Sequence, residues 1–466
     1  MKNVAFHNLG CKVNSYEIDV MQQNLQEKGY NIVPFDSKAD IYIVNTCTVT
    51  NIADRKSRQM LHRAKQKNPD AIVVAVGCYV QTGREDVEKD PCIDLAIGNN
   101  RKKDLPEILE RYLKERESAV QGTSFDVIDI NSTYEYEEMT LKQTAEHTRA
   151  YIKIQDGCNQ FCSYCVIPYA RGRVRSRLAE DIMAEIEGIV KVGYREIVLT
   201  GIHISSYGID FEEDAWKQGK SVEVCHTGER RDYTGSSKLI DLIEKIHGIE
   251  GLERIRLGSL EPRIVTEDTA RRLAALPKIC PHFHLSLQSG CDETLKRMNR
   301  HYSAGQYLQS VEFLRREFDH PAITTDVIVG FPGETEEEFA ATKAFLEKVG
   351  FYEMHIFKYS KRAGTRAAEM PGQVPDQVKT ARSNELLSLE RIQSHAFRSR
   401  YIGEWAEVLL EEEKEIDGKI YWLGHTKDYV KVAVPDGASN LLVNCEIKDF
   451  LKDDILLAGQ LNFADK

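Results

Sequence analysis

The chain of 466 residues has no apolar run long enough to cross a bilayer. Its best candidate, Ala71–Val80, offers about half of the roughly 20 apolar residues that a transmembrane helix needs. The segment Met1–Gly10 also lacks the extended apolar stretch of a secretory signal peptide. We therefore expect a cytoplasmic protein without a membrane partner.

The chain also has no excess of positive charge. The net charge is −11, which argues against a surface that binds polyanions over its whole extent. The deficit is largest in Tyr401–Lys466, which has seven Lys and no Arg against fourteen Asp and Glu. If the partner is a nucleic acid, its phosphates must be met by local basic patches elsewhere.

Disulfide chemistry is also not indicated. The 11 cysteines form an odd set, and without a secretion signal they favour ligands or free thiols in a reducing compartment. The length predicts two or three domains.

The first part of the chain alternates apolar, strand-like runs with amphipathic helical stretches. The predicted strands are residues 4–10, 41–47, 71–78 and 94–98, and the predicted helices lie around 16–28 and 53–66. This alternation predicts a doubly wound α/β domain over residues 1–120. A charged, acidic linker is predicted at 121–148.

Three cysteines follow the ends of three different predicted strands. Cys11, Cys47 and Cys78 should therefore meet at the carboxyl edge of the sheet, where such folds bind ligands. A single cysteine there would be a small buried apolar residue, but three at equivalent positions favour an iron–sulfur cluster. Cys92 has no such position and is interpreted as structural.

Strand–helix alternation resumes over residues 149–375. Six strand candidates lie at 151–157, 196–202, 254–260, 282–288, 324–330 and 353–359. Six such units predict an open (β/α)₆ barrel with its site at the carboxyl ends of the strands. A long helix at 376–400 and five short β-like segments follow, and the latter predict a small antiparallel β-barrel at 401–466.

A second group of thiols, Cys158, Cys162 and Cys165, has C-x₃-C-x₂-C spacing just after the first strand of this barrel. Three thiolates can hold one soft metal centre and leave one iron of a cubane cluster without a protein ligand. The alternatives are a zinc site, for which His147 would be the nearest fourth ligand, or unrelated buried cysteines.

Tyr164 and the apolar, then basic, continuation Val166–Arg173 make this stretch resemble the radical S-adenosylmethionine (radical SAM) superfamily. The resemblance implies that S-adenosylmethionine binds the open iron and that an electron from a donor such as flavodoxin or ferredoxin releases a 5′-deoxyadenosyl radical. Turns after the strands suit a nucleoside. The expected S-adenosylmethionine contacts are Tyr164, Gly201, Ser286, Gln288 and Gly330.

The order of the predicted domains resembles the methylthiotransferases of that superfamily, which end in an RNA-binding barrel of the TRAM type. The stretches GCKVN, NTCTVTNIADRKSRQ, GCYVQ and IQDGCNQFCSYCVIPYARG resemble the branch that modifies N6-threonylcarbamoyladenosine in tRNA. The resemblance implies two [4Fe–4S] clusters. It also implies that the barrel cluster generates the radical that takes hydrogen from C2 of the adenine at position 37 of the anticodon loop, and that the cluster on Cys11, Cys47 and Cys78 carries the sulfur.

Basic stretches beside predicted strand ends are the candidate RNA contacts, and an ordinary solvated charged face is an equally good interpretation of them. The candidates are Arg171, Arg173, Arg175 and Arg177, then Lys296, Arg297 and Arg300, and a third patch of Lys358, Lys361, Arg362 and Arg366. An acidic, glycine-containing insertion at 205–236, with Cys225 and His226, is expected to be a loop over the site.

Three alternatives remain open. The substrate could be isopentenyladenosine in tRNA or a ribosomal-protein aspartate, and the acidic terminal barrel favours the latter. A non-catalytic iron–sulfur RNA-binding protein is the third possibility. It has no evident use for Tyr164 or for glycine-bearing strand ends.

Overall fold

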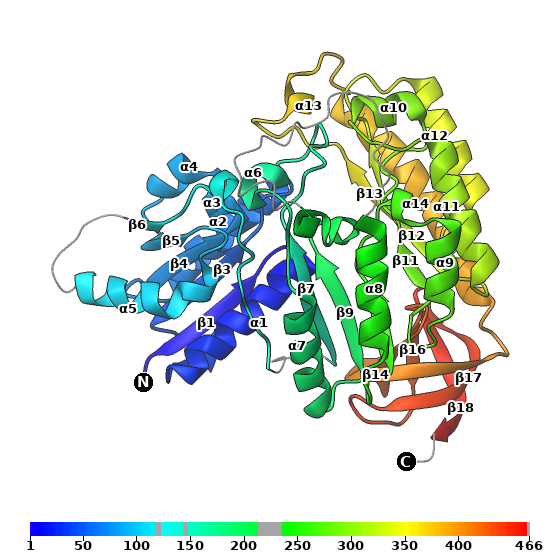
Figure 1. The fold of residues 1–466 in the computed structure, drawn as a ribbon, viewed down its shortest axis with the longest axis horizontal. Helices are drawn as coiled ribbons and strands as arrows, with labels where there is room; N and C mark the ends of the chain where they lie inside the picture. Colours follow the sequence, from blue (N-terminus) through cyan, green and yellow to red (C-terminus); the bar gives the residue numbers. More distant parts are fainter. Residues whose placement is uncertain (117–122, 143–147, 213–234, 464–466) are drawn as a thin grey trace.

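The computed structural model describes residues 1–116, 123–142, 148–212 and 235–463. The predicted insertion lies mostly outside these residues, as do Cys225, His226 and His147. Figure 1 shows an α/β domain at the amino terminus, a central barrel and a small β-barrel at the carboxyl terminus. Among the described residues, no helix is both long and apolar enough to span a membrane.

The amino-terminal sheet is entirely parallel, with strand order β2-β1-β3-β4-β5-β6. Its strands are β1 (Asn3–Asn8), β2 (Asn31–Val33), β3 (Ile41–Thr46), β4 (Ile72–Gly77), β5 (Leu95–Ile97) and β6 (Ser124–Asp126). Strand β6 lies inside the predicted linker at 121–148, so the sheet extends past the expected boundary at residue 120.

Helices cover both faces of this sheet, as a doubly wound fold requires. Helices α1 (Lys12–Glu27) and α5 (Leu105–Arg116) pack on one face, and α2 (Asn51–Lys67) and α3 (Cys78–Thr82) pack on the other. A short helix, α4 (Arg84–Glu88), follows α3.

The central barrel has six parallel strands in sequence order, which confirms the prediction. They are β7 (Arg149–Asp156), β9 (Glu196–Gly201), β10 (Arg254–Leu257), β11 (His282–His284), β12 (Ala322–Val329) and β13 (Glu353–Lys358). Isolated bridges from Ile255 to Ile279 and from Leu260 to Leu285 join the two halves. A two-residue strand, β8 (Arg175–Ser176), pairs antiparallel with β7 at the edge.

Helices surround this barrel on the outside (Figure 1). The longer ones are α7 (Ala179–Lys191), α8 (Gly235–His247), α9 (Glu267–Ala274), α11 (Ala304–Glu317), α12 (Glu336–Val349) and α14 (Asp376–Ser399). Three short ones, α6 (Ile167–Arg171), α10 (Asp292–Arg297) and α13 (Arg366–Glu369), lie near the carboxyl ends of the strands.

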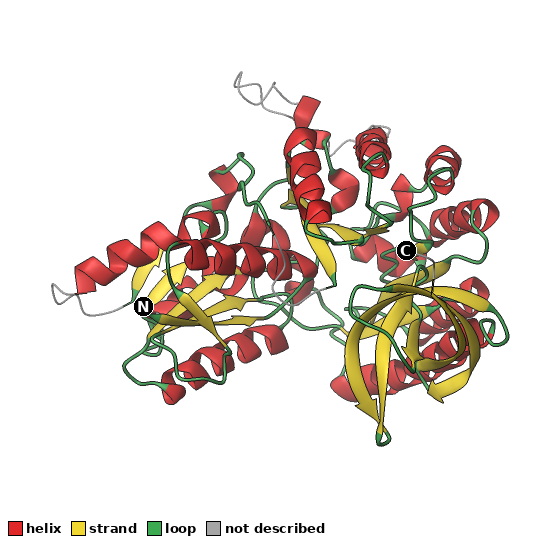
Figure 2. Ribbon diagram, turned by 90° about the horizontal axis from the view of Figure 1, so that it is seen from below, coloured by secondary structure: helices red, strands yellow, loops and turns green. Residues whose placement is uncertain are grey.

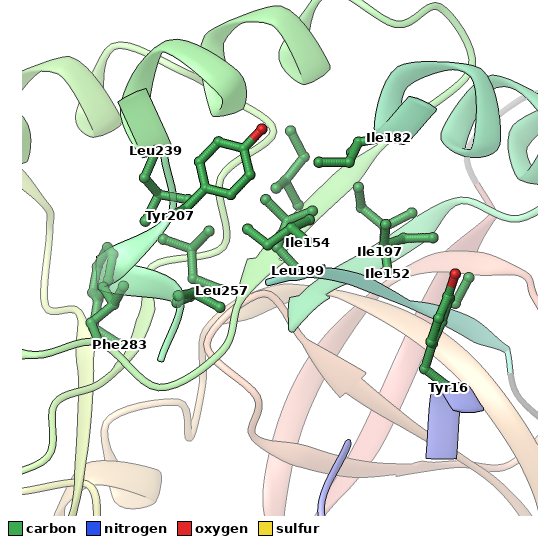
Figure 3. Close-up of a cluster of buried hydrophobic side chains, with 14 of the residues drawn as sticks. Tyr16, Ile152, Ile154, Ile182, Ile197, Leu199, Tyr207, Leu239, Leu257 and Phe283 are labelled. Carbon is green, nitrogen blue, oxygen red and sulfur yellow. The ribbon is translucent and has the colours of Figure 1, made fainter. Parts of the chain in front are cut away.

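The barrel and the first domain share one hydrophobic core. Figure 3 shows Tyr16 of α1 beside barrel residues such as Ile152 and Ile197. The Tyr16 hydroxyl donates hydrogen bonds to the Met139 carbonyl and, at 3.0 Å, to Glu185 Oε1 of α7. This shared packing fixes the orientation of the amino-terminal domain against the barrel.

The carboxyl-terminal strands close into a barrel of order β14-β15-β16-β18-β17 (Figure 2). The strands are β14 (Trp405–Ile416), β15 (Lys419–Thr426), β16 (Lys431–Val434), β17 (Leu442–Lys452) and β18 (Ile455–Phe463). All neighbouring pairs are antiparallel except β16 and β18, which run parallel.

The turn between β15 and β16 inserts its Tyr429 ring beneath the central barrel. The guanidinium groups of Arg149 and Arg256 lie 4.9 and 4.6 Å from the centre of that ring. Glu196 balances these buried arginines and accepts a hydrogen bond of 2.9 Å from Arg256 Nε. The small barrel thus closes the amino-terminal end of the large one.

Candidate functional site

Strand register brings the first three thiols to one edge of the amino-terminal sheet. Thr46 pairs with Gly77, so the residues that follow, Cys47 and Cys78, leave neighbouring strands at the same level. Gly10, with φ of +122°, passes so close that a Cβ there would lie 3.1 Å from the Cβ of Cys47. Cys11 follows it and is the N-cap residue of α1.

Polar side chains hold this first trio, Cys11, Cys47 and Cys78, in place. The amide of Asn99 lies 3.5 Å from Cys78 Sγ. The hydroxyl of Ser57 contacts the backbone N–H and carbonyl of Cys47 at 3.3 and 3.1 Å. Burial, together with the neighbouring Cys78 and Cys11 thiols, raises the pKa of the Cys47 thiol to about 11. A metal centre that binds the thiolates therefore has to displace protons that burial retains.

The second trio, Cys158, Cys162 and Cys165, lies in the loop between β7 and α6. The backbone N–H of Cys165 donates to the Cys162 carbonyl at 2.9 Å, and that of Cys158 donates to the Gly172 carbonyl at 3.0 Å. Burial, together with the Cys162 thiol, raises the pKa of Cys158 to about 12. Burial also raises the pKa of Cys165.

A cavity of about 280 Å³ opens directly onto this loop. It is lined by Asn159, Gln160, Phe161, Cys162, Ser163, Cys165, Tyr169, Asn299, His301, Thr365 and Arg366. Its volume is near the lower end of the range for small-molecule sites. Two of the three thiols thus face a space that can hold a ligand.

Arg300 approaches the second trio from the turn after α10. Its Nη1 donates to Cys162 Sγ at 3.2 Å, and its Nε donates to the Tyr302 hydroxyl at 2.9 Å. The guanidinium carries a fixed positive charge, so the contact is a charge-assisted hydrogen bond to the sulfur.

The two trios face each other across a single interface. Helix α3, which begins at Cys78, packs against α6, which follows Cys165. The Asn99 amide that contacts Cys78 also donates to the Ala170 carbonyl at 2.7 Å. One side chain therefore contacts both the thiol edge of the first domain and the helix that ends the cysteine loop of the barrel.

A buried ionic network ties this interface together. Arg171 of α6 donates to Glu17 Oε1 at 2.7 Å and to Asn14 Oδ1 at 2.7 Å, both on α1. Glu17 also forms ion pairs with Lys102 and Lys153. Asp156 forms ion pairs with Lys153 and Arg171. Because these charged groups are buried, removing one of them would leave its partners as unpaired buried charges, which is strongly destabilising.

The spacing of the thiols tests which metal centre they fit. In the described part of the chain, two groups of three possible ligand atoms lie within 4.8 Å of one another, and neither contains any of the six cysteines in the trios. A tetrahedral zinc ion, with Zn–S of about 2.3 Å, needs sulfur atoms roughly 3.8 Å apart. The wider spacing and the all-sulfur donor sets fit a multi-iron cluster better.

The predicted S-adenosylmethionine contacts have mixed surroundings. Tyr164 packs edge-on against Phe331, with ring centres 6.2 Å apart, and burial next to the Cys162 thiol raises its pKa. Gly201 is the last residue of β9, and Ser286 lies just after β11. Gln288 has a φ of +70°. Gly330 packs against the Lys379 side chain, which an added Cβ would meet at 2.3 Å.

The expectation that the first arginine stretch contacts RNA is wrong for three of its four members. Arg171, Arg175 and Arg177 are each at most 1% exposed. Their carboxylate partners come from elsewhere, Glu17 and Asp156 for Arg171 and Glu185 for Arg177. Arg173 is half-buried over the Phe161 ring.

The other basic candidates separate into internal and exposed groups. Arg297 pairs with Glu338, Arg300 contacts Cys162, and Arg362 is buried against Asp54 and Thr48 of the first domain. Of these three, Arg362 is buried, and Arg297 and Arg300 are half-buried. The exposed members are Lys296, Lys358, Lys361 and Arg366.

Sequence reasoning missed Asn99 and Glu17. Asn99 follows the predicted strand at 94–98, so the strand-end rule that identified the cysteines applied to it as well. Nothing local marks Glu17, because all its charged partners are at least 85 residues away in the chain.

Family comparisons agree with this layout. Residues 152–346 match the Radical SAM superfamily, and residues 3–98 match the Uncharacterized protein family UPF0004. The solved structure of a radical S-adenosylmethionine methyltransferase, TsrM from Kitasatospora setae, aligns with a TM-score of 0.52 at 15% identity. It covers 79% of this chain and 74% of that chain, and it shows likeness of fold alone.

Curated relatives extend over almost the whole length. A threonylcarbamoyladenosine tRNA methylthiotransferase MtaB from Bacillus subtilis is 39% identical over 433 residues, 93% of this chain and 90% of the relative. The protein of that name from Aquifex aeolicus is 38% identical, with 89% and 94% covered. A tRNA-2-methylthio-N(6)-dimethylallyladenosine synthase from Finegoldia magna is 33% identical, with 97% and 93% covered. The chain therefore belongs to the radical SAM tRNA methylthiotransferase family.

Proposed function

We propose that this enzyme adds a methylthio group to C2 of N6-threonylcarbamoyladenosine at position 37 of the tRNA anticodon loop. The observation that carries the proposal is the pair of thiol trios on the two sides of one interface, with a cavity beside the second. Identity of 39% and 38% to two threonylcarbamoyladenosine enzymes supports this substrate over dimethylallyladenosine, for which the identity of the relatives is 33 to 34%.

In this proposal Cys158, Cys162 and Cys165 hold one [4Fe–4S] cluster, and Cys11, Cys47 and Cys78 hold the other. When bound, these groups and S-adenosylmethionine supply the radical and the sulfur that an unactivated C2–H bond requires. An electron donor of the flavodoxin or ferredoxin class fits the cytoplasmic location that we infer.

The side chains of the protein have separate tasks in this scheme. Arg300 places positive charge beside Cys162 and so offsets the negative charge of a sulfur that binds the cluster. Asn99 fixes the distance between Cys78 and α6. The Arg171–Glu17 pair fixes the first domain against the barrel, so the two reacting centres keep a constant separation. Proximity of this kind is a large part of the rate of a transfer between two sites.

The rim of the cavity is where tRNA would enter. Tyr169 is 49% exposed and lines the cavity, so its ring offers a stacking face to an unstacked base. The exposed Arg366 lines the same cavity, and Lys361 lies close by in sequence. These charges can neutralise phosphates of the anticodon loop, while the acidic terminal barrel contributes little.

Mass spectrometry of tRNA nucleosides tests the proposal. A strain without the gene should lose 2-methylthio-N6-threonylcarbamoyladenosine and accumulate the unmodified threonylcarbamoyl nucleoside. The wild-type gene should restore the product, and a Cys158→Ala gene should not. Loss of the methylthio group from isopentenyladenosine instead would overturn the choice of substrate.

A further inference from the structure

Two histidines and one aspartate meet on three neighbouring strands inside the central barrel. His284 ends β11, Asp326 lies on β12, and His355 lies on β13. One ligand atom of each lies within 4.8 Å of the other two. We propose that these residues form a binding site for a divalent transition-metal ion of the zinc class, separate from both thiol trios.

The spacing within the group matches metal ligation. His284 Nε2 lies 3.4 Å from Asp326 Oδ2. That is long for a hydrogen bond, but two ligand atoms about 2.1 Å from a tetrahedral ion stand roughly 3.4 Å apart. Register places His355 directly opposite Asp326, and its ring stacks on that of His284 with centres 5.9 Å apart. Two imidazoles and one carboxylate form a common ligand set for such ions.

The buried Thr324 supports His284 from behind. Its hydroxyl lies 3.0 Å from His284 Nδ1 and is on the strand partner of that residue. In metal sites the nitrogen of a ligating histidine that does not bind the ion is held by such a partner, which directs the other nitrogen to the ion. With Nδ1 engaged, Nε2 is the atom directed toward Asp326.

In the described chain, a second group of possible metal ligands, His62, Asp90 and Cys92, is held together by hydrogen bonds instead. His62 Nε2 lies 2.8 Å from Asp90 Oδ2, and Asp90 Oδ1 accepts the backbone N–H of Cys92 at 3.0 Å. Direct hydrogen bonds therefore explain why these residues are close, and no ion is needed. Among His284, Asp326 and His355 the contacts are the 3.4 Å approach of His284 to Asp326 and the stacking of the two imidazole rings, and neither is a short hydrogen bond.

The position of the site gives it access to the reaction space. Asp326 and Ile328 project to the same side of β12, and Ile328 packs in the cluster that includes Tyr164. Two residues of strand separate them, so Asp326 lies about 7 Å along β12 from Ile328. Three protein ligands leave at least one coordination position open. A bound ion could accept an oxygen or nitrogen donor from a molecule in the barrel.

Zinc uptake by the cluster-loaded enzyme tests the site. With both clusters reconstituted anaerobically, the six thiols are occupied and cannot take zinc. After equilibrium dialysis against zinc, elemental analysis should find one more zinc in the wild type than in His355→Gln or Asp326→Asn. His395→Gln, on the exposed face of α14 against Phe450, is the matched control and should equal the wild type.

Further readouts separate a metal site from a merely structural role. Thr324→Val should lower the zinc affinity by about 10- to 100-fold, because it removes the partner of His284 while keeping the shape of the side chain. Iron content shows that each variant has folded, and the exposed His355 can be changed without opening the core. Equal zinc in the wild type and in His355→Gln would overturn the proposal, whatever the nucleoside product is.

Discussion

The two thiol trios are built in opposite ways. Cys158, Cys162 and Cys165 belong to one loop, which has a few backbone hydrogen bonds of its own and opens onto a cavity. Cys11, Cys47 and Cys78 are separated by 67 residues of chain and meet only because three parallel strands end at one level. The first arrangement depends on a local loop, and the second depends on the whole sheet and on the domain interface. Their sensitivities to mutation should differ accordingly.

The largest expected effect separates the two trios by chemistry. Cys158→Ala should abolish formation of 5′-deoxyadenosine and of the methylthio product, because it removes a ligand of the cluster that activates S-adenosylmethionine. Cys47→Ala should keep 5′-deoxyadenosine formation and lose the product. Chromatography of both compounds measures this, with the half-buried Cys291→Ala as control. If Cys47→Ala also failed to form 5′-deoxyadenosine, the two trios would not have the separate chemical roles proposed here.

The next effect tests the dependence of the first trio on the interface. Glu17→Gln leaves the buried Arg171, Lys102 and Lys153 short of a negative charge, so the free energy of unfolding should fall by roughly 3 to 5 kcal/mol. Denaturant titration measures it. Glu85→Gln removes an exposed partner of Lys89 and should change little. A Glu17→Gln protein as stable as the wild type would contradict the role of this network.

The pH dependence of stability tests Glu196 at the amino-terminal end of the central barrel, away from both thiol trios. Burial raises the pKa of Glu196, but Arg256, Arg149 and Arg254 outweigh burial and bring it down to about 2. Because the folded-state pKa lies below the ordinary value, the stabilisation is present above about pH 4.5 and is lost as pH falls toward 2. Its size is on the order of 3 kcal/mol.

Glu196→Gln should remove this dependence. Denaturant unfolding of cluster-free protein at a series of acidic pH values should show a steeper loss of stability in the wild type than in the variant. If stability fell equally with pH in the two proteins, Glu196 would not be the carboxylate that the arginines at the base of the barrel stabilise.

The smallest effect concerns the barrel trio alone. Arg300→Gln removes a charged hydrogen bond to Cys162 worth about 1.5 to 3 kcal/mol, so S-adenosylmethionine cleavage should slow by about tenfold or more. Arg297→Gln, three residues away and paired with Glu338, should cleave at nearly the wild-type rate. Equal rates in both variants would mean that Arg300 does not act on the cysteine loop.

Sequence reasoning succeeded where one rule linked residue order to position. The strand ends at Cys47 and Cys78 were predictable because parallel strands share a carboxyl edge. Burial of charge was not predictable in the same way. Arg171 and Arg177 follow a polar pattern typical of a surface, but their partners Glu17 and Glu185 come from helices on two different domains.

The same limit applies to the histidine and aspartate ligands. His284, Asp326 and His355 stand on strands whose register determines which side chains become neighbours, and register over 71 residues of chain cannot be read from local spacing. The parallel pair β16 and β18 in the last barrel has the same origin, since pairing direction there depends on how the barrel closes.

Iron content per chain tests the central claim most directly. Anaerobically reconstituted wild-type protein should hold two [4Fe–4S] clusters. Replacing all of Cys11, Cys47 and Cys78 by alanine should remove half of the iron, and replacing Cys158, Cys162 and Cys165 should remove the other half. A wild-type protein with the iron of a single cluster, or a trio whose replacement leaves the iron unchanged, would contradict the account.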